Sequence, residues 1–460
     1  MGGGEELSAI DRRVPENYGA AVSASRLSSR LLLPTSLAVA MVALLAAPAS
    51  AAPGDLDPTF GRGGGVITRI GYYAEAESVA IQPDGKIVVA GSSNPFVEGL
   101  AWDAAVVRYL PTGALDPKFG SNGKVTTPIG SYSDYGFAVA LQSDGKILVA
   151  GVSYFLSIPR FALVRYTSTG ALDTTFGSGG KVVTGFGNGY DFAQAVGVQS
   201  DGKIVVAGYS SNFSDYDFAM VRYTTAGALD PTFGSGGKVR TPIGSGDDRA
   251  TALAIQSDDR IVLAGYSMSE STFDDFALVR YTSNGALDPT WGSGGIVTTS
   301  LGGGTDQAQA VAVQANGKIV VAGSTHRATH DFAVVRYLST GVLDTTFSSD
   351  GKVATDFASD GDVAYGVAIQ SNGRIVAAGE ASVPGFGDTF GLARYTISGA
   401  LDSTFGSGGR VMTTGEGAAG IRGVALQSDG KIVVAGSGGY TVPGSAIDFT
   451  VARYLGDPIT

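Results

Sequence analysis

The sequence of 460 residues contains no cysteine and only two histidines. The absence of cysteine excludes disulfide bonds, thiolate metal sites and cysteine nucleophiles. Two histidines leave almost no room for histidine-rich zinc sites or for Ser–His catalysis. Basic residues are also scarce: 31 Lys and Arg stand against 42 Asp and Glu, which gives a net charge of −11. Because phosphate binding needs a basic surface, we expect no nucleic-acid partner.

Charged residues of both signs make up only 16% of the chain, whereas 44% is apolar and 69 residues are glycine. This apolar fraction excludes disorder, and the absence of a three-residue glycine period excludes collagen. Many short apolar runs separated by glycine are typical of an all-β protein with many turns.

The N-terminal region has the features of an export signal. A basic stretch ending at Arg30 precedes an apolar run over residues 31–47, and Ala49-Ser50-Ala51 fits a small-x-small cleavage site. The run is short for a membrane span and contains Pro34. We therefore predict a signal peptide with a long n-region over residues 1–51. The mature chain is then secreted, periplasmic or at the cell surface, without a membrane span; an uncleaved anchor is the alternative.

Comparison of the chain with itself shows three anchors that each recur seven times, which predicts a repeat architecture. The first anchor, Leu-Asp-x-x-aromatic, begins at Leu56, Leu115, Leu172, Leu229, Leu287, Leu343 and Leu401. The second is a Gln, a turn of the Asp-Gly-Lys type and an Ile-Val-Val-Ala-Gly strand, beginning at Gln82, Gln142, Gln199, Gln256, Gln314, Gln370 and Gln427. The third is a Val-Arg-Tyr strand, whose arginines are Arg108, Arg165, Arg222, Arg280, Arg336, Arg394 and Arg453. Residues 52–460 are thus predicted to form seven repeats of about 57 residues, the spacing from Leu172 to Leu229.

Each repeat is predicted to contain four short strands, which in the second repeat span 125–127, 137–142, 146–151 and 161–166. Asp144-Gly145 between the middle two is a strong hairpin signal. Strands such as 204–207 are apolar on both faces, so both faces must be covered. Antiparallel sheets stacked around an axis provide that cover. We therefore predict an all-β, seven-bladed β-propeller with four antiparallel strands per blade.

The ring is predicted to close through the N-terminal strand. The first and last repeats are as apolar as the middle ones, which an open stack would not tolerate. The mature chain begins with an unpaired outer strand at 66–69 and ends on a strand at 449–454, so the first strand is expected to complete the last blade. The strand nearest the axis is predicted from its small central residue, which is Ala80, Ala140, Gly197, Ala254, Ala312, Ala368 or Ala425.

The segment Ala171–Val182, ALDTTFGSGGKV, followed by Val198–Gly208, VQSDGKIVVAG, resembles the delta-60 repeat of bacterial exported proteins. Its layout is also similar to NHL-type propeller blades. The resemblance covers Leu56 to Tyr454. It implies a propeller of a kind that mostly binds protein, RNA or glycans; the few enzymes among such propellers use metal-binding histidines that these repeats lack.

Six of the seven strand arginines are followed eight residues later by an aspartate. The pairs are Arg108 and Asp116, Arg165 and Asp173, Arg222 and Asp230, Arg280 and Asp288, Arg336 and Asp344, and Arg394 and Asp402. A catalytic site is not normally copied seven times, so we interpret them as structural ion pairs. Arg453 lacks such an aspartate and Asp57 lacks such an arginine. These two are predicted to pair where the ring closes.

An aspartate precedes the innermost strand in five repeats, at Asp134, Asp191, Asp248, Asp306 and Asp362. A second series, Asp103, Asp217, Asp275, Asp331 and Asp448, opens the Val-Arg-Tyr strands on the same face. One interpretation is that these short side chains satisfy backbone N–H groups of the turns. The other is an acidic rim at the channel mouth that holds Ca²⁺ or a cationic ligand. No other cofactor is expected.

Aromatic residues gather in the loops of this face. The ligand-binding candidates are Trp102, Tyr132, Tyr135, Tyr154, Tyr190, Tyr209, Tyr216 and Tyr266. Tyr and Trp offer large contact area at a low entropy cost, although some of them are equally expected to cover blade ends. His326 and His330 have a spacing seen at metal sites, but no fourth ligand is evident in the sequence.

Departures from the repeat symmetry look scattered along the chain, whereas an enzyme needs one converging set of polar residues. We therefore predict a non-catalytic, monomeric, exported scaffold that binds an extracellular or periplasmic protein or glycan through an acidic, Tyr-rich loop face. The alternative is a Ca²⁺-dependent propeller hydrolase or lyase with carboxylates at the central channel mouth.

Overall fold

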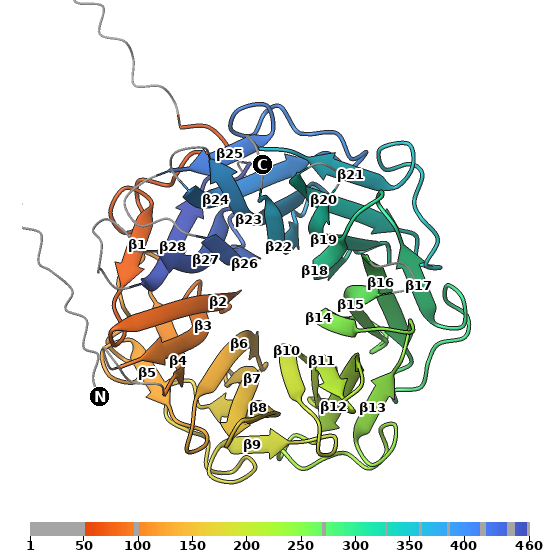
Figure 1. Ribbon diagram of the computed structural model, residues 1–460. Coiled ribbons are helices and arrows are strands. Elements are labelled where there is room, and N and C mark those ends of the chain that lie inside the picture. Colours follow the sequence, from red (N-terminus) through yellow and green to blue (C-terminus); the bar gives the residue numbers. More distant parts are fainter. Residues whose placement is uncertain are drawn as a thin grey trace, which may run out of the picture. The chain divides into compact units, whose positions relative to one another are not determined.

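The computed structural model describes residues 51–95, 101–268, 273–326, 329–357, 361–383, 387–414, 420–438 and 447–457. Within these residues, 28 strands form seven four-stranded antiparallel sheets around a central axis (Figure 1). The predicted seven-bladed β-propeller is confirmed. The predicted signal peptide lies outside the described residues, apart from Ala51. In the described ranges, no helix is long and apolar enough to cross a membrane.

The four strands of a blade are here called a, b, c and d from the axis outward, and in every blade except the last they follow one another in this order along the chain. Blade 1 consists of β2 (Tyr73–Ile81), β3 (Ile87–Asn94), β4 (Asp103–Tyr109) and β5 (Lys124–Thr127). Blade 2 consists of β6 (Asp134–Leu141), β7 (Ile147–Phe155), β8 (Ile158–Tyr166) and β9 (Lys181–Thr184). Blade 3 consists of β10 (Asp191–Val198), β11 (Ile204–Ser211), β12 (Tyr216–Tyr223) and β13 (Lys238–Thr241).

Blade 4 consists of β14 (Asp248–Ile255), β15 (Ile261–Met268), β16 (Asp274–Tyr281) and β17 (Ile296–Thr299). Blade 5 consists of β18 (Asp306–Val313), β19 (Ile319–His326), β20 (His330–Tyr337) and β21 (Lys352–Thr355). Blade 6 consists of β22 (Val363–Ile369), β23 (Ile375–Val383), β24 (Gly387–Tyr395) and β25 (Arg410–Thr413). Blade 7 consists of β26 (Gly420–Leu426), β27 (Ile432–Gly438), β28 (Asp448–Tyr454) and, as its outer strand, β1 (Gly65–Thr68).

The ring closes as predicted, through the first strand of the propeller. β1 pairs antiparallel with β28, from Gly65 opposite Ala452 to Thr68 opposite Phe449. An isolated bridge between Leu56 and Tyr454 extends this pairing toward the N-terminus. The N-terminal segment that leads into blade 1 is therefore held in blade 7 by backbone hydrogen bonds.

The two apolar faces of each blade pack against two different neighbours. In β11, Ile204 and Val206 belong to the core shared with blade 2, whereas Val205 and Ala207 belong to the core shared with blade 4. All four side chains are buried. Because successive residues of a strand point to opposite faces, an uninterrupted apolar strand is what this stacking requires.

Strand a lies innermost, and its small residue packs against the next blade. A side chain placed on Gly197 would begin 2.9 Å from the Ile255 Cδ1 atom of blade 4. Blades are closest together near the axis, which explains why Ala or Gly recurs at this position.

Strand a also carries a feature that the sequence did not reveal, which is a β-bulge in all seven blades. In β10 the pairing with β11 shifts between Ala193 and Ala195, so that Gln194 is the extra residue. The bulge brings strand a close to the glycine that recurs in strand b of every blade. A Cβ on Gly208 would lie only 1.9 Å from the Phe192 carbonyl oxygen. The same close approach, 1.8–2.0 Å, occurs at Gly91, Gly151, Gly265, Gly323, Gly379 and Gly436. The last residue of each Ile-Val-Val-Ala-Gly motif is therefore glycine because the bulge leaves no room for a side chain.

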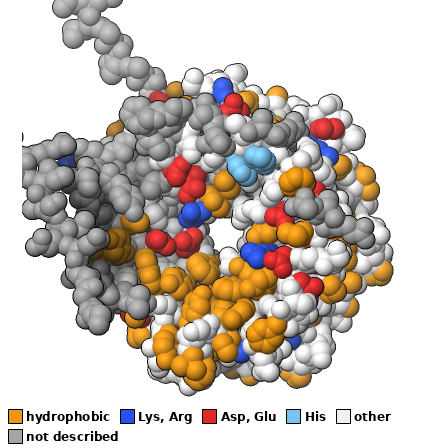
Figure 2. Space-filling model, viewed as in Figure 1, with side chains coloured by type: hydrophobic (Ala, Val, Ile, Leu, Met, Phe, Trp, Pro, Cys, Tyr) orange, Lys and Arg blue, Asp and Glu red, His pale blue; other side chains and the backbone are white. Residues whose placement is uncertain are grey.

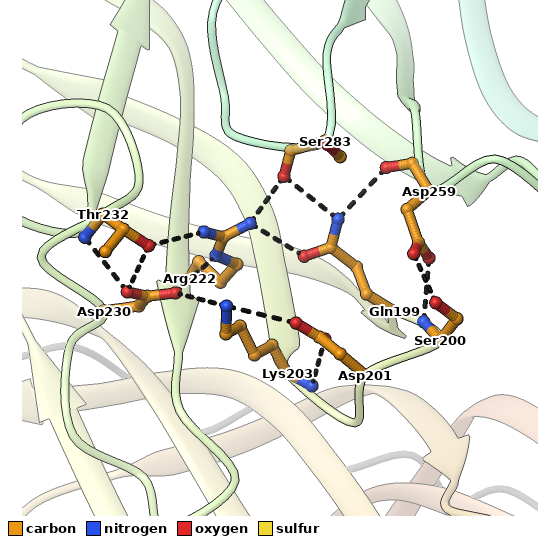
Figure 3. Close-up of polar contacts among 9 residues, drawn as sticks. All are labelled: Gln199, Ser200, Asp201, Lys203, Arg222, Asp230, Thr232, Asp259 and Ser283. Carbon is orange, nitrogen blue, oxygen red and sulfur yellow. Dashed lines mark hydrogen bonds and ion pairs between the residues drawn. The ribbon is translucent and has the colours of Figure 1, made fainter.

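The repeated arginines connect adjacent blades at the face opposite the d–a and b–c loops. Figure 3 shows Arg222, whose Nε donates to Asp230 at 2.9 Å and whose Nη1 donates to Gln199 and to the Ser283 carbonyl of the next blade. Its guanidinium also lies over the Phe233 ring at 4.5 Å. Ion pairs at the other six positions join Arg108–Asp116, Arg165–Asp173, Arg280–Asp288, Arg336–Asp344, Arg394–Asp402 and Arg453–Asp57. The last of these spans the closure, as the sequence suggested.

These pairs predict acid sensitivity. Burial alone raises the pKa of Asp230, but hydrogen bonds from Thr232 and the charge of Arg222 outweigh it and lower the pKa to about 2. A depressed pKa stabilises the folded state above the unfolded value of 3.8, and that stabilisation is lost as the pH falls through 2. We expect the difference in unfolding free energy between wild type and Asp230→Asn to shrink by about 2 kcal/mol from pH 6 to pH 2. Urea unfolding followed by circular dichroism measures this difference, and a difference independent of pH would contradict the assignment.

Candidate functional site

The seven bulge residues form a ring around the central channel. They are Glu77, Phe137, Gln194, Thr251, Gln309, Tyr365 and Arg422, and they line a cavity of about 480 Å³. Deeper in the cavity the wall is aliphatic, formed by Val79, Val139, Val196, Leu253, Val311, Val367 and Val424. The channel is thus polar and varied at the bulges and uniformly apolar below them.

A second set of varied positions lies two residues before each bulge, together with its cross-strand partner on strand b. These pairs are Glu75/Ser92, Tyr135/Val152, Phe192/Tyr209, Arg249/Tyr266, Gln307/Ser324, Val363/Glu380 and Gly420/Ser437. We call these pairs and the bulge residues the mouth. It lies on the face that carries the d–a and b–c loops, which is the face seen in Figure 2.

One group of aromatic side chains lies at the mouth on the side of blades 1 and 2. Tyr135 stacks between Trp102, at 5.8 Å, and the channel-lining Phe137, at 6.0 Å. Tyr154 meets Tyr135 edge-on at 6.1 Å. Tyr132 is 45% exposed and shares a hollow of about 370 Å³ with Tyr135 and Tyr154. Four of the eight predicted aromatic candidates therefore lie in one group.

The other aromatic candidates lie in blades 3 and 4. Phe192 stacks on Tyr209 at 5.1 Å, and Tyr216 meets Tyr209 edge-on at 5.2 Å. The guanidinium of Arg249 lies 4.7 Å from the Tyr216 ring centre, and it also interacts with Tyr266. Burial raises the pKa of Tyr209 to about 12, so this hydroxyl remains a hydrogen-bond donor. Figure 2 shows the resulting apolar patch, in orange, beside the central opening.

Tyr190 is the eighth candidate and lies farther out. It is 38% exposed and meets the exposed Phe213 edge-on at 6.0 Å. The tip of the b–c hairpin of blade 2 is also apolar, since Phe155 and Leu156 are 70% and 59% exposed.

Charged side chains form the opposite side of the mouth, where blades 6, 7 and 1 meet. Arg422 donates to Glu380 at 3.0 Å, and its guanidinium lies over the Tyr365 ring at 4.0 Å. Glu77 and Glu75 of blade 1 lie within electrostatic range of this pair. Burial, opposed by Arg422, raises the pKa of Glu77 to about 7. We call these five residues the seam cluster. The expectation that departures from symmetry are scattered was wrong, because the folded ring gathers five of them.

The predicted acidic series lies beneath the loops rather than in the channel wall. Asp134, Asp191, Asp248, Asp306 and Asp362 are fully buried and accept hydrogen bonds from backbone N–H groups of the preceding turn. Asp134, for example, accepts from Ile129 at 2.7 Å and from Gly130 at 3.0 Å. This geometry favours the turn-capping interpretation of the series, and metal binding stays a prediction.

Among the described residues, one group of carboxylates is close enough to share a cation. Oxygens of Asp331, Asp356 and Asp362 lie within 4.8 Å of one another at the junction of blades 5 and 6. Burial, together with these neighbouring charges, raises the pKa of Asp362 to about 6. His326 and His330 are cross-strand partners whose ring centres lie 4.5 Å apart with the planes tilted by 43°, and neither histidine is part of the group formed by these aspartates.

Sequence reasoning missed the seam cluster, together with Phe192 and Arg249 of the mouth. The signal that reveals them is the alignment of the seven strand-a segments, from YAEAESVAI in blade 1 to DQAQAVAV in blade 5. The flanking columns hold small or aliphatic residues in nearly every copy. The bulge column instead holds Glu, Phe, Gln, Thr, Gln, Tyr and Arg.

The chain matches the profile of a β-propeller domain of unknown function, DUF5122, in seven segments. They span 82–119, 142–176, 199–233, 256–290, 314–347, 370–405 and 427–457. The chain belongs to the DUF5122 β-propeller family. Each DUF5122 segment begins at the second anchor and contains the strand arginine, but none contains a bulge residue. The family therefore accounts for the fold and leaves the ring that lines the channel undefined. The delta-60 and NHL names for these repeats remain resemblances.

Solved structures resemble the chain at low sequence identity. A protein of unknown function from Dyadobacter fermentans is 12% identical, with 87% of this chain and 100% of that chain covered and a TM-score of 0.46. The polysaccharide lyase Uly1 is 11% identical, with 87% and 92% covered and a TM-score of 0.48. Sqt1 from Chaetomium thermophilum, bound to the N-terminus of ribosomal protein L10, is 12% identical, with 85% and 100% covered and a TM-score of 0.42. These similarities concern the fold alone. No curated protein matches the chain.

Proposed function

We propose that this DUF5122 propeller is a non-catalytic scaffold that binds a protein or a glycan at the mouth. The observation that carries the proposal is that side chains at equivalent positions are alike where the fold needs them and different where the channel opens. A ligand without seven-fold symmetry is held in one orientation only if the seven blades offer it different groups. The bulge ring offers six residue types at seven positions.

Of the two ligand classes, a glycan fits the mouth better. Small-ligand sites are concave cavities of about 300–1,000 Å³ that combine apolar walls with a few placed polar groups. The channel has this form, with Phe137 on one side and amide, hydroxyl and charged groups on the others. Stacked aromatic rings suit the C–H face of a sugar, since the ring face carries negative charge density.

Export and a monomeric state belong to the same proposal. The signal features of residues 1–51 support delivery of the propeller to the periplasm, the cell surface or the medium. Ring closure supports a monomer, because it covers the apolar faces of blades 1 and 7 that would otherwise drive association.

A glycan array combined with pull-down tests the proposal. We expect residues 52–460 to retain a glycan, and the double variant Tyr135→Ala, Phe192→Ala to lose at least tenfold in affinity, because two aromatic surfaces of the mouth are removed. The matched control is Val342→Ala, which shortens an apolar side chain that is 60% exposed on the opposite face. Equal affinity of the double variant and the control would contradict a binding site at the mouth.

A further inference from the structure

The seam cluster and the aromatic stack are neighbours on the channel wall. Glu77 of β2 and Phe137 of β6 occupy equivalent bulges in adjacent blades. Two hydrogen bonds join β6 to blade 1: Val139 N–H donates to Ser78 of β2 and Gly136 N–H donates to Ser92 of β3, each at 3.2 Å. Carboxyl groups and an aromatic surface therefore border one continuous part of the cavity.

The seam cluster has more acidic than basic groups. Three carboxyl groups, of Glu75, Glu77 and Glu380, interact electrostatically with the single guanidinium of Arg422. Arg422 is itself occupied by Glu380 and by the Tyr365 ring. Within the described part of the chain, Glu77 lines the cavity without accepting a hydrogen bond. An entering cation would therefore gain an ionic partner without displacing an existing pair.

The aromatic stack next to Glu77 leads from the channel to the outer rim. Phe137 lines the cavity, Tyr135 stacks on it at an interplanar angle of 10°, and Trp102 stacks on Tyr135 at 28°. Carboxylates beside aromatic rings attract an organic cation in two ways. The carboxylates form ion pairs with it, and the negative faces of the rings attract its positive charge.

We propose that this part of the mouth, from Glu380 through Glu77 to Phe137, is a subsite for an amino sugar, with the ammonium at the carboxyl groups and the sugar ring on the aromatic wall. The inference rests on the proposed function and names the class of its ligand. Gln194, Thr251 and Gln309 complete the ring and offer donors and acceptors to sugar hydroxyls. A lysine side chain would form ion pairs with the carboxyl groups only, because its alkyl chain carries no donor or acceptor that could hydrogen-bond to Gln194, Thr251 and Gln309.

The test compares a glucosamine tetramer with its N-acetylated counterpart by titration calorimetry. We expect wild type to bind the free amine at least tenfold more tightly, because acetylation removes the positive charge. Glu77→Gln should abolish the preference and Glu77→Asp should keep part of it.

The matched control is Asp84→Asn, which removes an exposed carboxylate on the opposite face and should leave the preference intact. Thermal unfolding of each variant identifies any loss of affinity that follows from misfolding. Binding of both tetramers with equal affinity would overturn the amino-sugar inference and leave glycan binding at the mouth standing. Binding of a lysine-rich peptide in place of either tetramer would overturn the inference as well. Failure of all glycans and proteins to bind would instead overturn the proposed function.

Discussion

Deletion of residues 52–69 is expected to abolish cooperative folding of the propeller. The deletion removes β1, leaving β28 without its outer partner and Arg453 without Asp57. It also removes Phe60, which is fully buried and lies 4.6 Å from the Arg453 guanidinium. A buried charge that loses its partner costs about 3–5 kcal/mol, and the loss of a buried Phe side chain costs a similar amount. The sum is comparable to the whole stability of a typical domain, about 5–15 kcal/mol.

Calorimetry of the purified protein measures this effect, and deletion of residues 1–51 alone is the matched control. The control should unfold at the same temperature as the full chain, because it keeps β1 and the bonds that join its neighbours to blades 6 and 7, from Gly406 N–H to the Pro53 carbonyl and from Gly54 N–H to the Leu455 carbonyl. A 52–69 deletion that still melted in one sharp transition near the control would show that the seven blades hold together without the closing strand.

Gly208→Ala is expected to destabilise the protein by about 3 kcal/mol or more. The added methyl group would lie 1.9 Å from the Phe192 carbonyl oxygen, so the β-bulge of strand a would have to move. Because Gly208 does not have a positive φ, the cost arises from this contact and not from backbone strain. Overpacking of a well-packed region costs typically about 1–3 kcal/mol and more where backbone must shift.

Gly187→Ala is the control for this substitution. Gly187 lies in the d–a loop of the same blade region, and a Cβ placed on it meets nothing within 4 Å. The free energies of unfolding of the two variants, measured in urea, should differ by the whole expected destabilisation of about 3 kcal/mol or more. The aromatic pair Phe192–Tyr209 adjoins the bulge, so Gly208→Ala should also alter the near-ultraviolet circular dichroism. Two variants of equal stability would mean that the bulge does not require this glycine.

The ring and its ion pairs could be predicted because the sequence repeats them. Each copy of the Arg–Asp pair is local, eight residues apart, and the exception at Arg453 and Asp57 identified the closure. The β-bulge could not be predicted in the same way, because the repeated glycine is compatible with many strand conformations. Only the pairing of β10 with β11 shows why no side chain fits there.

The candidate site was predicted in part. Loop position alone identified Tyr135, Tyr154 and Trp102, which the structure brings into one stacked group. Capping of the turns was one of two interpretations of the aspartates before strand a, and the structure favours it over a rim on the channel wall. Loop position could not join Glu77 to Arg422, which are 345 residues apart in the chain, from 77 to 422, and become neighbours because blade 7 meets blade 1.

The sequence by itself determined the number of blades, the strand order and the direction of closure, since these follow from a local pattern copied seven times. The tertiary structure alone decided which side chains share the channel. Circular closure places one residue from each copy at the axis, and the bulge turns that residue toward the cavity. The chemistry of the mouth therefore depends on seven residues, one from each repeat, that differ from one another. Their combination cannot be recognised in the sequence, because only the closed ring brings them together.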